Sequence, residues 1–152
     1  IAPFIMNCYE DKYSGSSSMK IGWSDNDGND YAGFGFYTTK NSTGTVNISS
    51  SGYKCLEFYV KKSVEGLSTE CVLRVNIPVS TNRLETDYLE ISQADISDGE
   101  WHRFRIPITS FTTDKWHNLT SYVGIALARK EGASGSGGGE VYIDQIRFIK
   151  NL

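Results

Sequence analysis

The chain has 152 residues, of which 39% are hydrophobic, 12% aromatic and 22% charged. This length and composition suit one globular domain with a hydrophobic core, and they exclude a disordered chain. The formal net charge of −3 argues against nucleic acid or an anionic membrane as a partner, because both attract a basic surface.

Short runs of alternating apolar and polar residues follow one another along the chain, and turn-rich loops such as SDNDGND and GASGSGGG separate them. No window shows the period of a helix, and no apolar run approaches the length of a membrane span. Strands without helices have to form two packed sheets or a closed barrel. The alternation predicts strands at 5–9, 18–23, 31–38, 54–61, 71–78, 86–92, 101–107, 121–129 and 140–149, and it allows a short additional strand at 45–48.

The start of the chain and its cysteines give weaker indications. The chain begins at Ile1 without an initiator Met or a signal peptide, so we expect residues 1–152 to be a single module excised from a larger protein. The three cysteines, Cys8, Cys55 and Cys71, fit one disulfide with a free thiol or no disulfide at all. Their spacing does not fit a zinc site.

Five segments carry a resemblance to a known family: GSSSMKIGWSD at 15–25, YAGFGF at 31–36, CLEFYVKK at 55–62, DGEWHRFRIPITSF at 98–111 and GEVYIDQIRF at 139–148. In this order they resemble the jelly-roll carbohydrate-binding modules, the non-catalytic domains of plant cell-wall polysaccharide-degrading enzymes. The resemblance implies an all-β fold, a β-sandwich jelly roll of two antiparallel sheets. It assigns the second, fourth, seventh and ninth strands to one sheet and the third, fifth, sixth and eighth strands to the other.

Within the second of these sheets, alternation assigns the side chains to two faces, with apolar residues such as Leu73 and Val75 pointing inward. The outward set combines small residues with long polar or aromatic ones: Gly33, Gly35, Gly124 and Ala126 with Tyr37, Arg74, Asn76, Tyr88 and Glu90. Small residues let a sugar ring approach the backbone, aromatic rings stack on it, and planar polar groups bridge its hydroxyls. This outer face is the predicted carbohydrate site.

A purely structural interpretation of the same face stays open. Outward glycines can mark a bulge or a bend, and Arg74 with Glu90 can be an ordinary cross-strand ion pair. Trp116 lies in the polar loop TTDKWHNLT. It is either a further stacking platform for a sugar or a lid on a small satellite core.

The outer face of the other sheet is predicted to be a solvated, convex side. Alternation places Glu57, Tyr59, Trp101, Arg103 and Arg105 on it. We expect Trp101 to pack over the loop that precedes it.

The resemblance also implies a structural calcium ion between the first, second and last strands. Its ligands would be Glu10, a carbonyl group near Lys20, and Asp144. A carboxylate inside an apolar strand needs a partner, and a hard cation supplies one. The alternative is that Asp144 accepts hydrogen bonds from loop amides or pairs with Lys20.

For function, the resemblance implies binding of plant cell-wall polysaccharide or oligosaccharide chains in a cleft across a concave sheet. β-Glucans rank first, and xylan, mannan and galactan follow. Binding would target a covalently linked catalytic domain, or a cellulosome-type component, to its substrate. We expect a secreted, extracellular, monomeric module without nucleic-acid or membrane partners.

Enzymatic and adhesive functions are the alternatives. The sequence has no G-x-S-x-G motif, and His102 and His117 lack a metal-binding spacing. His102 has core parity in its strand, so we expect it to be buried. A small polysaccharide lyase remains open because Tyr37, Tyr88 and Arg74 share a predicted face, and so does a cell-surface adhesion or protein-interaction sandwich.

Overall fold

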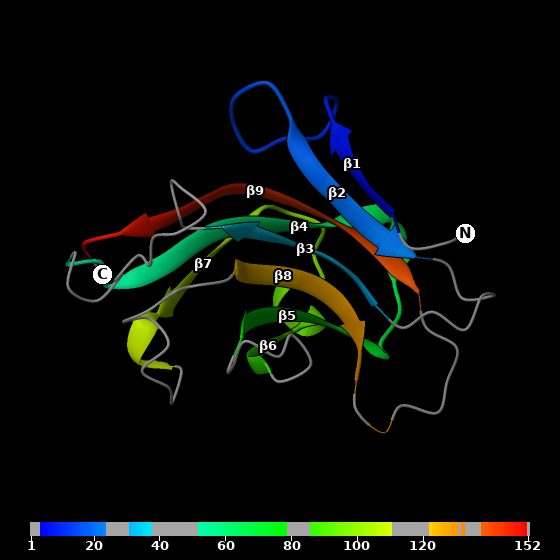
Figure 1. Ribbon diagram of the computed structural model, residues 1–152. Helices are drawn as coiled ribbons and strands as arrows, with labels where there is room; N and C mark the ends of the chain where they lie inside the picture. The colour runs from blue at the N-terminus through cyan, green and yellow to red at the C-terminus, as the bar shows by residue number, and fades with distance from the viewer. Residues whose placement is uncertain are drawn as a thin grey trace.

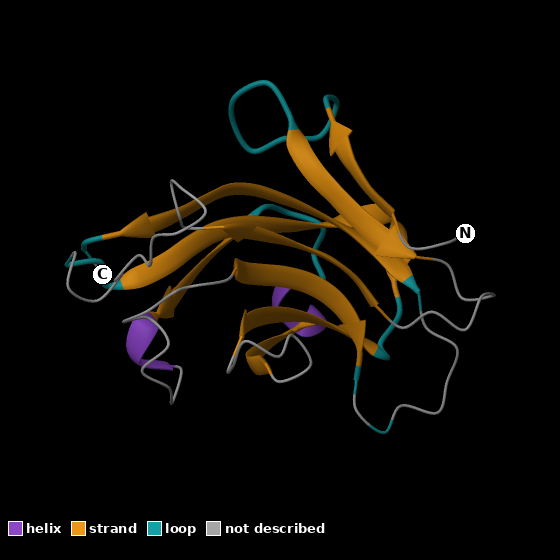
Figure 2. Cartoon of the chain, viewed as in Figure 1, coloured by secondary structure: helices purple, strands orange, loops and turns teal. Residues whose placement is uncertain are grey.

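The computed structural model describes residues 4–23, 31–37, 52–78, 86–110, 122–130, 132 and 138–151. These residues form β-strands joined by loops and two short 3-10 helices (Figures 1 and 2). The elements are β1 (Phe4–Cys8), β2 (Ser18–Trp23), β3 (Tyr31–Tyr37), β4 (Cys55–Leu67), β5 (Cys71–Pro78), β6 (Thr86–Ser92), η2 (Gln93–Ile96), β7 (His102–Pro107), η3 (Ile108–Ser110), β8 (Tyr122–Arg129) and β9 (Gly139–Ile149). The positions of all the expected strands are confirmed, while the additional strand at 45–48 lies outside the described residues.

The strands pair into two antiparallel sheets that lie one over the other (Figure 1). The five-stranded sheet has the order β1-β2-β9-β4-β7, and the four-stranded sheet has the order β3-β8-β5-β6. This wiring confirms the β-sandwich and the division of strands that the resemblance implied. It also adds β1, which the sequence left unassigned, to the edge of the larger sheet.

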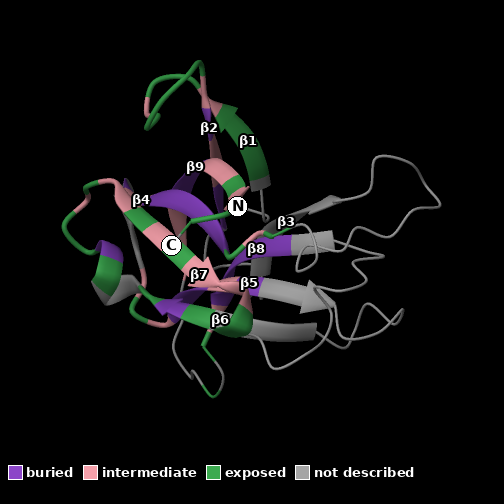
Figure 3. Ribbon diagram, turned by 90° about the vertical axis from the view of Figure 1, so that its left-hand side faces the viewer, coloured by how far each residue is buried: buried purple, intermediate pink, exposed green. Residues whose placement is uncertain are grey.

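The hydrophobic core fills the space between the sheets. On β4 the inward residues Leu56, Phe58 and Val60 have no exposed surface, and Leu73 and Val75 of β5 are as well buried. The buried segments of the strands are purple in Figure 3. The period of two in the sequence therefore marked the inner faces correctly, because burial on one side selects apolar residues at every second position.

β4 is longer than its apolar alternation indicates. The sequence predicts an end near residue 61, whereas the strand continues to Leu67, which pairs with Gly139 of β9. A register shift between Lys62 and Leu67 accompanies this extension. Backbone pairing with β9 thus continues the strand past the residues whose alternation predicts it.

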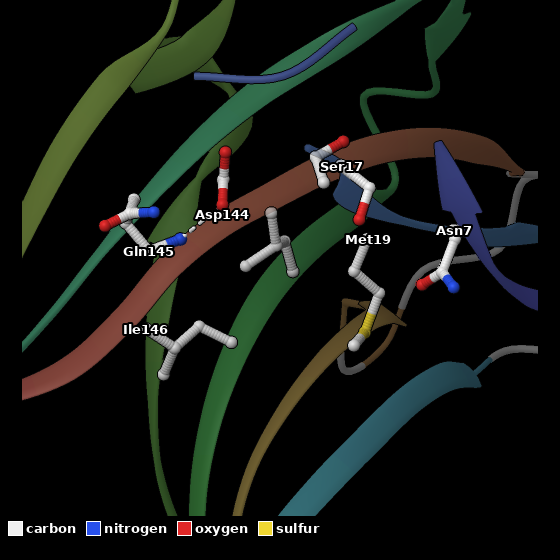
Figure 4. Close-up of a pocket in the computed structure, with 8 residues that line it drawn as sticks. Asn7, Ser17, Met19, Asp144, Gln145 and Ile146 are labelled. Carbon is white, nitrogen blue, oxygen red and sulfur yellow. Dashed lines mark hydrogen bonds between the residues drawn. The ribbon is translucent and has the colours of Figure 1, made fainter. Parts of the chain in front are cut away.

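A bulge interrupts β9 opposite β4. Glu57 pairs with Arg147, yet Tyr59 pairs with Asp144, so β9 carries one extra residue there. Gln145 takes the positive φ of 51° that accommodates it. Figure 4 shows the consequence, with Asp144 and Ile146 on opposite sides of the strand. The bulge brings both Asp144 and Arg147 to the outer face.

Cys8, Cys55 and Cys71 are all free thiols. Of the two alternatives that the sequence left open, the structure therefore shows the one without a disulfide. The described part of the chain contains no helix with the length and apolarity that a membrane span requires.

Candidate functional site

The four-stranded sheet brings the predicted sugar-binding positions together in two adjacent rows. Each row crosses β3, β8, β5 and β6 in turn, and its members are paired residue by residue. The first row is Gly33, Ala126, Arg74 and Glu90, and the second is Gly35, Gly124, Asn76 and Tyr88. Positions between 33 and 126 in the sequence therefore meet on one face, which alternation alone could not show.

Arg74 holds a defined position in the first row. Its Nε donates to Glu90 Oε1 at 3.1 Å, and its Nη2 lies 3.0 Å from the same oxygen. Nη2 also donates to the backbone carbonyl oxygen of Arg129 at 3.2 Å. The side chains expose 19% for Arg74 and 39% for Glu90. An ion pair is present, and its planar donors and acceptors remain within reach of a ligand.

The small residues of β8 are less exposed than the alternation of the strand predicted. Gly124 is buried, and Ala126 has no exposed surface. A sugar ring on this face would contact the groups that cover the Ala126 methyl group, and not the methyl group itself. The two rows are formed as predicted, but their β8 members, Gly124 and Ala126, are not exposed to solvent.

Several predicted positions are placed only by their backbone. Tyr37 pairs with Tyr122 at the next step of the same face. The side chains of Tyr37, Asn76 and Tyr88 are outside the described set, and so is the whole of Trp116. Their contacts with a sugar stay predictions.

Asp144, the predicted calcium ligand, is held by backbone amides. Its Oδ2 accepts hydrogen bonds from Tyr13 N at 3.0 Å and Ser14 N at 3.1 Å, and its Oδ1 accepts one from Gln145 N at 2.7 Å. The residue is 8% exposed. The loop amides that the sequence offered as an alternative are therefore its partners.

The surroundings of Asp144 fit a calcium ion poorly. Calcium takes six to eight oxygen ligands, whereas three N–H groups point at this carboxylate. Lys20 Nζ lies 2.7 Å from Glu140 Oε2, and that hydrogen bond raises the pKa of Lys20. Among the described residues no group of three or more His, Cys, Asp or Glu side chains could hold a metal ion. Calcium at Glu10, Lys20 and Asp144 stays a prediction of the resemblance.

On the five-stranded sheet, the expectation that Glu57 and Tyr59 are solvated is wrong. Glu57 has no exposed surface and Tyr59 is 9% exposed. Arg105 Nε donates to Glu57 Oε2 at 2.6 Å, and Arg147 Nε donates to Glu57 Oε1 at 2.8 Å. Burial alone would raise the pKa of Glu57, but the hydrogen bonds from the two arginines bring it below its usual value.

The sequence indicated part of this arrangement, in which two exposed arginines pair with one buried glutamate. Glu57 and Arg105 alternate outward on their strands, but their partnership depends on the pairing of β4 with β7 and β9. The expectation that His102 is buried is also wrong. Its side chain is 33% exposed, and its Nε2 lies 2.6 Å from Asp98 Oδ1. The ring therefore pairs with an exposed loop carboxylate and is not buried in the core.

Comparisons with known proteins agree with this architecture. The family model described as carbohydrate binding domain 30 matches residues 5–150. A comparison with curated protein sequences gave no match.

Three solved structures illustrate the likeness in fold. A family 30 module of a cellulosomal cellulase from Clostridium thermocellum has 12% identity and a TM-score of 0.54, with 96% of this chain and 82% of that one covered. A family 11 module from Clostridium thermocellum, in complex with a β-1,3-1,4-mixed-linked tetrasaccharide, has 12% identity and a TM-score of 0.56, with 100% and 86% covered. A non-crystalline cellulose-specific module, CBM28, has 13% identity and a TM-score of 0.60, with 97% and 82% covered.

Proposed function

The chain belongs to the carbohydrate binding domain 30 family, and we propose that it binds single β-glucan chains on the outer face of its four-stranded sheet. As a member of this family it is a non-catalytic carbohydrate-binding module, so the lyase alternative is set aside.

The observation that carries the proposal is the pair of rows across β3, β8, β5 and β6. They align the Arg74–Glu90 pair with Asn76 and Tyr88 on neighbouring strands. Hydroxyls along one edge of a glucan chain can donate to the carboxylate and accept from the guanidinium, and the Tyr88 ring is the stacking surface that the sequence predicts beside them. A strip of polar groups with an aromatic beside it suits one extended chain better than a crystalline surface.

The ranking of ligands draws on the relatives. The family 11 module was solved with a mixed-linked glucan fragment, and CBM28 is specific for non-crystalline cellulose. Both ligands are glucans, so mixed-linkage glucan, xyloglucan and cellulose-derived chains come first for this chain. Xylan, mannan and galactan follow.

Affinity gel electrophoresis against these soluble polysaccharides tests the proposal. We expect β-glucan gels to retard the chain, and Arg74→Ala and Tyr88→Ala each to weaken binding by about tenfold or more, as for a central contact residue. Lys54→Ala is the matched control, because it removes an exposed positive charge just before β4, outside the four-stranded sheet. Free migration in every gel, or equal retardation of all variants, would contradict the proposal.

We further propose that this module is a monomer that directs a covalently linked catalytic domain to its substrate in a secreted protein. A cellulosomal cellulase carries one of the structural relatives, which supports such an attachment. Light scattering of the chain and the sequence of its parent protein test these points.

A further inference from the structure

The outer face of the five-stranded sheet carries an aromatic surface that the proposed β-glucan site does not use. Tyr13 stacks on Tyr59 with ring centroids 3.8 Å apart and an interplanar angle of 19°. The Trp101 ring meets the Tyr13 ring edge-on, with ring centroids 6.1 Å apart, and its centroid lies 6.5 Å from that of the Tyr142 ring. Tyr59 is 9% exposed whereas Tyr13 is 47% exposed. The Tyr13 ring therefore covers Tyr59 and turns its other side to solvent.

The β1–β2 loop (residues 9–17) that presents Tyr13 is fixed from several sides. Asp144 accepts the backbone N–H groups of Tyr13 and Ser14. Lys61 Nζ lies 2.8 Å from Asp11 Oδ2, and Ser18 Oγ donates to the Asp11 carbonyl oxygen at 2.6 Å. A hydrogen bond with Tyr59 raises the pKa of the Tyr13 hydroxyl. The ring is thus held in place before any ligand arrives, which lowers the entropy cost of stacking on it.

Arginine side chains stand beside this ring. Arg103 pairs directly with Tyr59 across β7 and β4, and Arg105 follows on the same face. Arg147 pairs with Glu57 from the other side of β4. Arg103 is exposed, and the side chains of Arg105 and Arg147 expose 37% and 55%. We call Tyr13, Trp101, Arg103, Arg105 and Arg147 the aromatic–arginine surface.

The charge of this surface is opposite to that of the molecule. This face has three guanidinium groups, those of Arg103, Arg105 and Arg147, and two carboxylates, those of Glu57 and Asp144, while the whole chain carries a net charge of −3. An arginine has five N–H donors, and the contacts with Glu57 use one donor of Arg105 and two of Arg147. Donors therefore remain for an anionic group, and arginine forks match a carboxylate in geometry.

We propose that the aromatic–arginine surface is a second carbohydrate subsite, and that its ligand is a uronic acid unit of an acidic polysaccharide. The pyranose ring stacks on Tyr13, and its carboxylate pairs with the guanidinium groups of Arg103 and Arg105. A neutral sugar offers the ring but not the charge, so the surface discriminates in favour of acidic chains. This inference rests on the family's carbohydrate binding and does not depend on the β-glucan site of the opposite sheet.

Isothermal titration calorimetry with two xylo-oligosaccharides of equal length, one carrying a glucuronic acid unit and one unsubstituted, tests the inference. We expect the acidic oligosaccharide to bind at least about tenfold more tightly, with an affinity that falls as salt increases because the contact is ionic. Tyr13→Ala and Arg103→Gln should each weaken acidic binding by about tenfold. Arg103→Gln leaves the contacts of Glu57 with Arg105 and Arg147 intact.

Two further variants separate ring stacking from loop packing. Tyr13→Phe keeps the ring and should retain most of the acidic binding, while Tyr9→Ala removes another exposed tyrosine of the same loop and should change nothing. Equal affinity for the two oligosaccharides, or full acidic binding by Tyr13→Ala, would overturn the inference. A parallel titration of the wild-type chain with a neutral cello-oligosaccharide shows whether the β-glucan proposal stands in either case.

Discussion

The outer faces of the two sheets both pair arginine with glutamate across neighbouring strands, but in different surroundings. On the four-stranded sheet Arg74 meets Glu90, whose side chain is 39% exposed. On the five-stranded sheet Arg105 and Arg147 meet Glu57, which has no exposed surface. Exposed pairs contribute little to stability and stay available to ligands. A buried carboxylate depends on its partners. Burial therefore decides how much such a pair matters for stability: little for Arg74 with Glu90, and much for Glu57 with its two arginines.

Removal of the two arginine partners of Glu57 should have the largest effect on stability. The double variant Arg105→Ala/Arg147→Ala leaves a buried carboxylate unpaired, and we expect the free energy of unfolding to fall by about 3–5 kcal/mol. Arg74→Ala on the other sheet should lower it by less than about 1 kcal/mol. Urea denaturation measures both. Similar losses for the two variants would mean that burial does not separate the faces.

The amide contacts of Asp144 have no counterpart among the described residues of the four-stranded sheet. Asp144→Ala removes the acceptor of three backbone N–H groups, two of them in the exposed β1–β2 loop, where water replaces part of the loss. We expect the unfolding free energy to fall by about 1–3 kcal/mol. Hydrogen exchange of the Tyr13 and Ser14 amides should speed up more than that of the β4 amides. Unchanged exchange would show that the loop is held by its other contacts.

The buried Glu57 should make the stability of the chain depend on pH. The folded pKa of Glu57 is lowered from an ordinary value of 4.5. Its contribution is therefore fully present above that value and is lost as the pH falls through the lower folded pKa. Glu57→Gln should flatten the decline of the melting temperature below about pH 5. An equally steep decline in Glu57→Gln would assign the acid sensitivity to other carboxylates.

The smallest expected effect concerns calcium on the five-stranded sheet. Because N–H donors already occupy the Asp144 carboxylate, we expect the same melting temperature in calcium and in a chelator. A site that binds only the folded chain would raise the melting temperature with calcium by mass action. Such a rise, lost in Asp144→Asn, would establish the calcium ion that the resemblance implied.

Alternation along each strand was enough to find the strands and the inner faces. Leu73 and Val75 point inward as expected, and Arg74 between them points outward. The division of strands between the sheets came from the resemblance and is confirmed. The prediction for Glu57 failed because parity separates two faces of a sheet but says nothing about what covers the outer one.

The positions of the strands follow from the local residue pattern of this chain, because a half-buried sheet imposes a period of two on its own residues. Which outward residues come into contact depends instead on how the strands pair and on how the loops pack. Glu57 and Arg147 stand 90 positions apart, and their contact depends on the register of β4 with β9 and on the bulge at Gln145. Tyr13 reaches Tyr59 because a loop folds back over the sheet. Such long-range pairings arise from backbone hydrogen bonding and packing between distant segments, which no local pattern encodes.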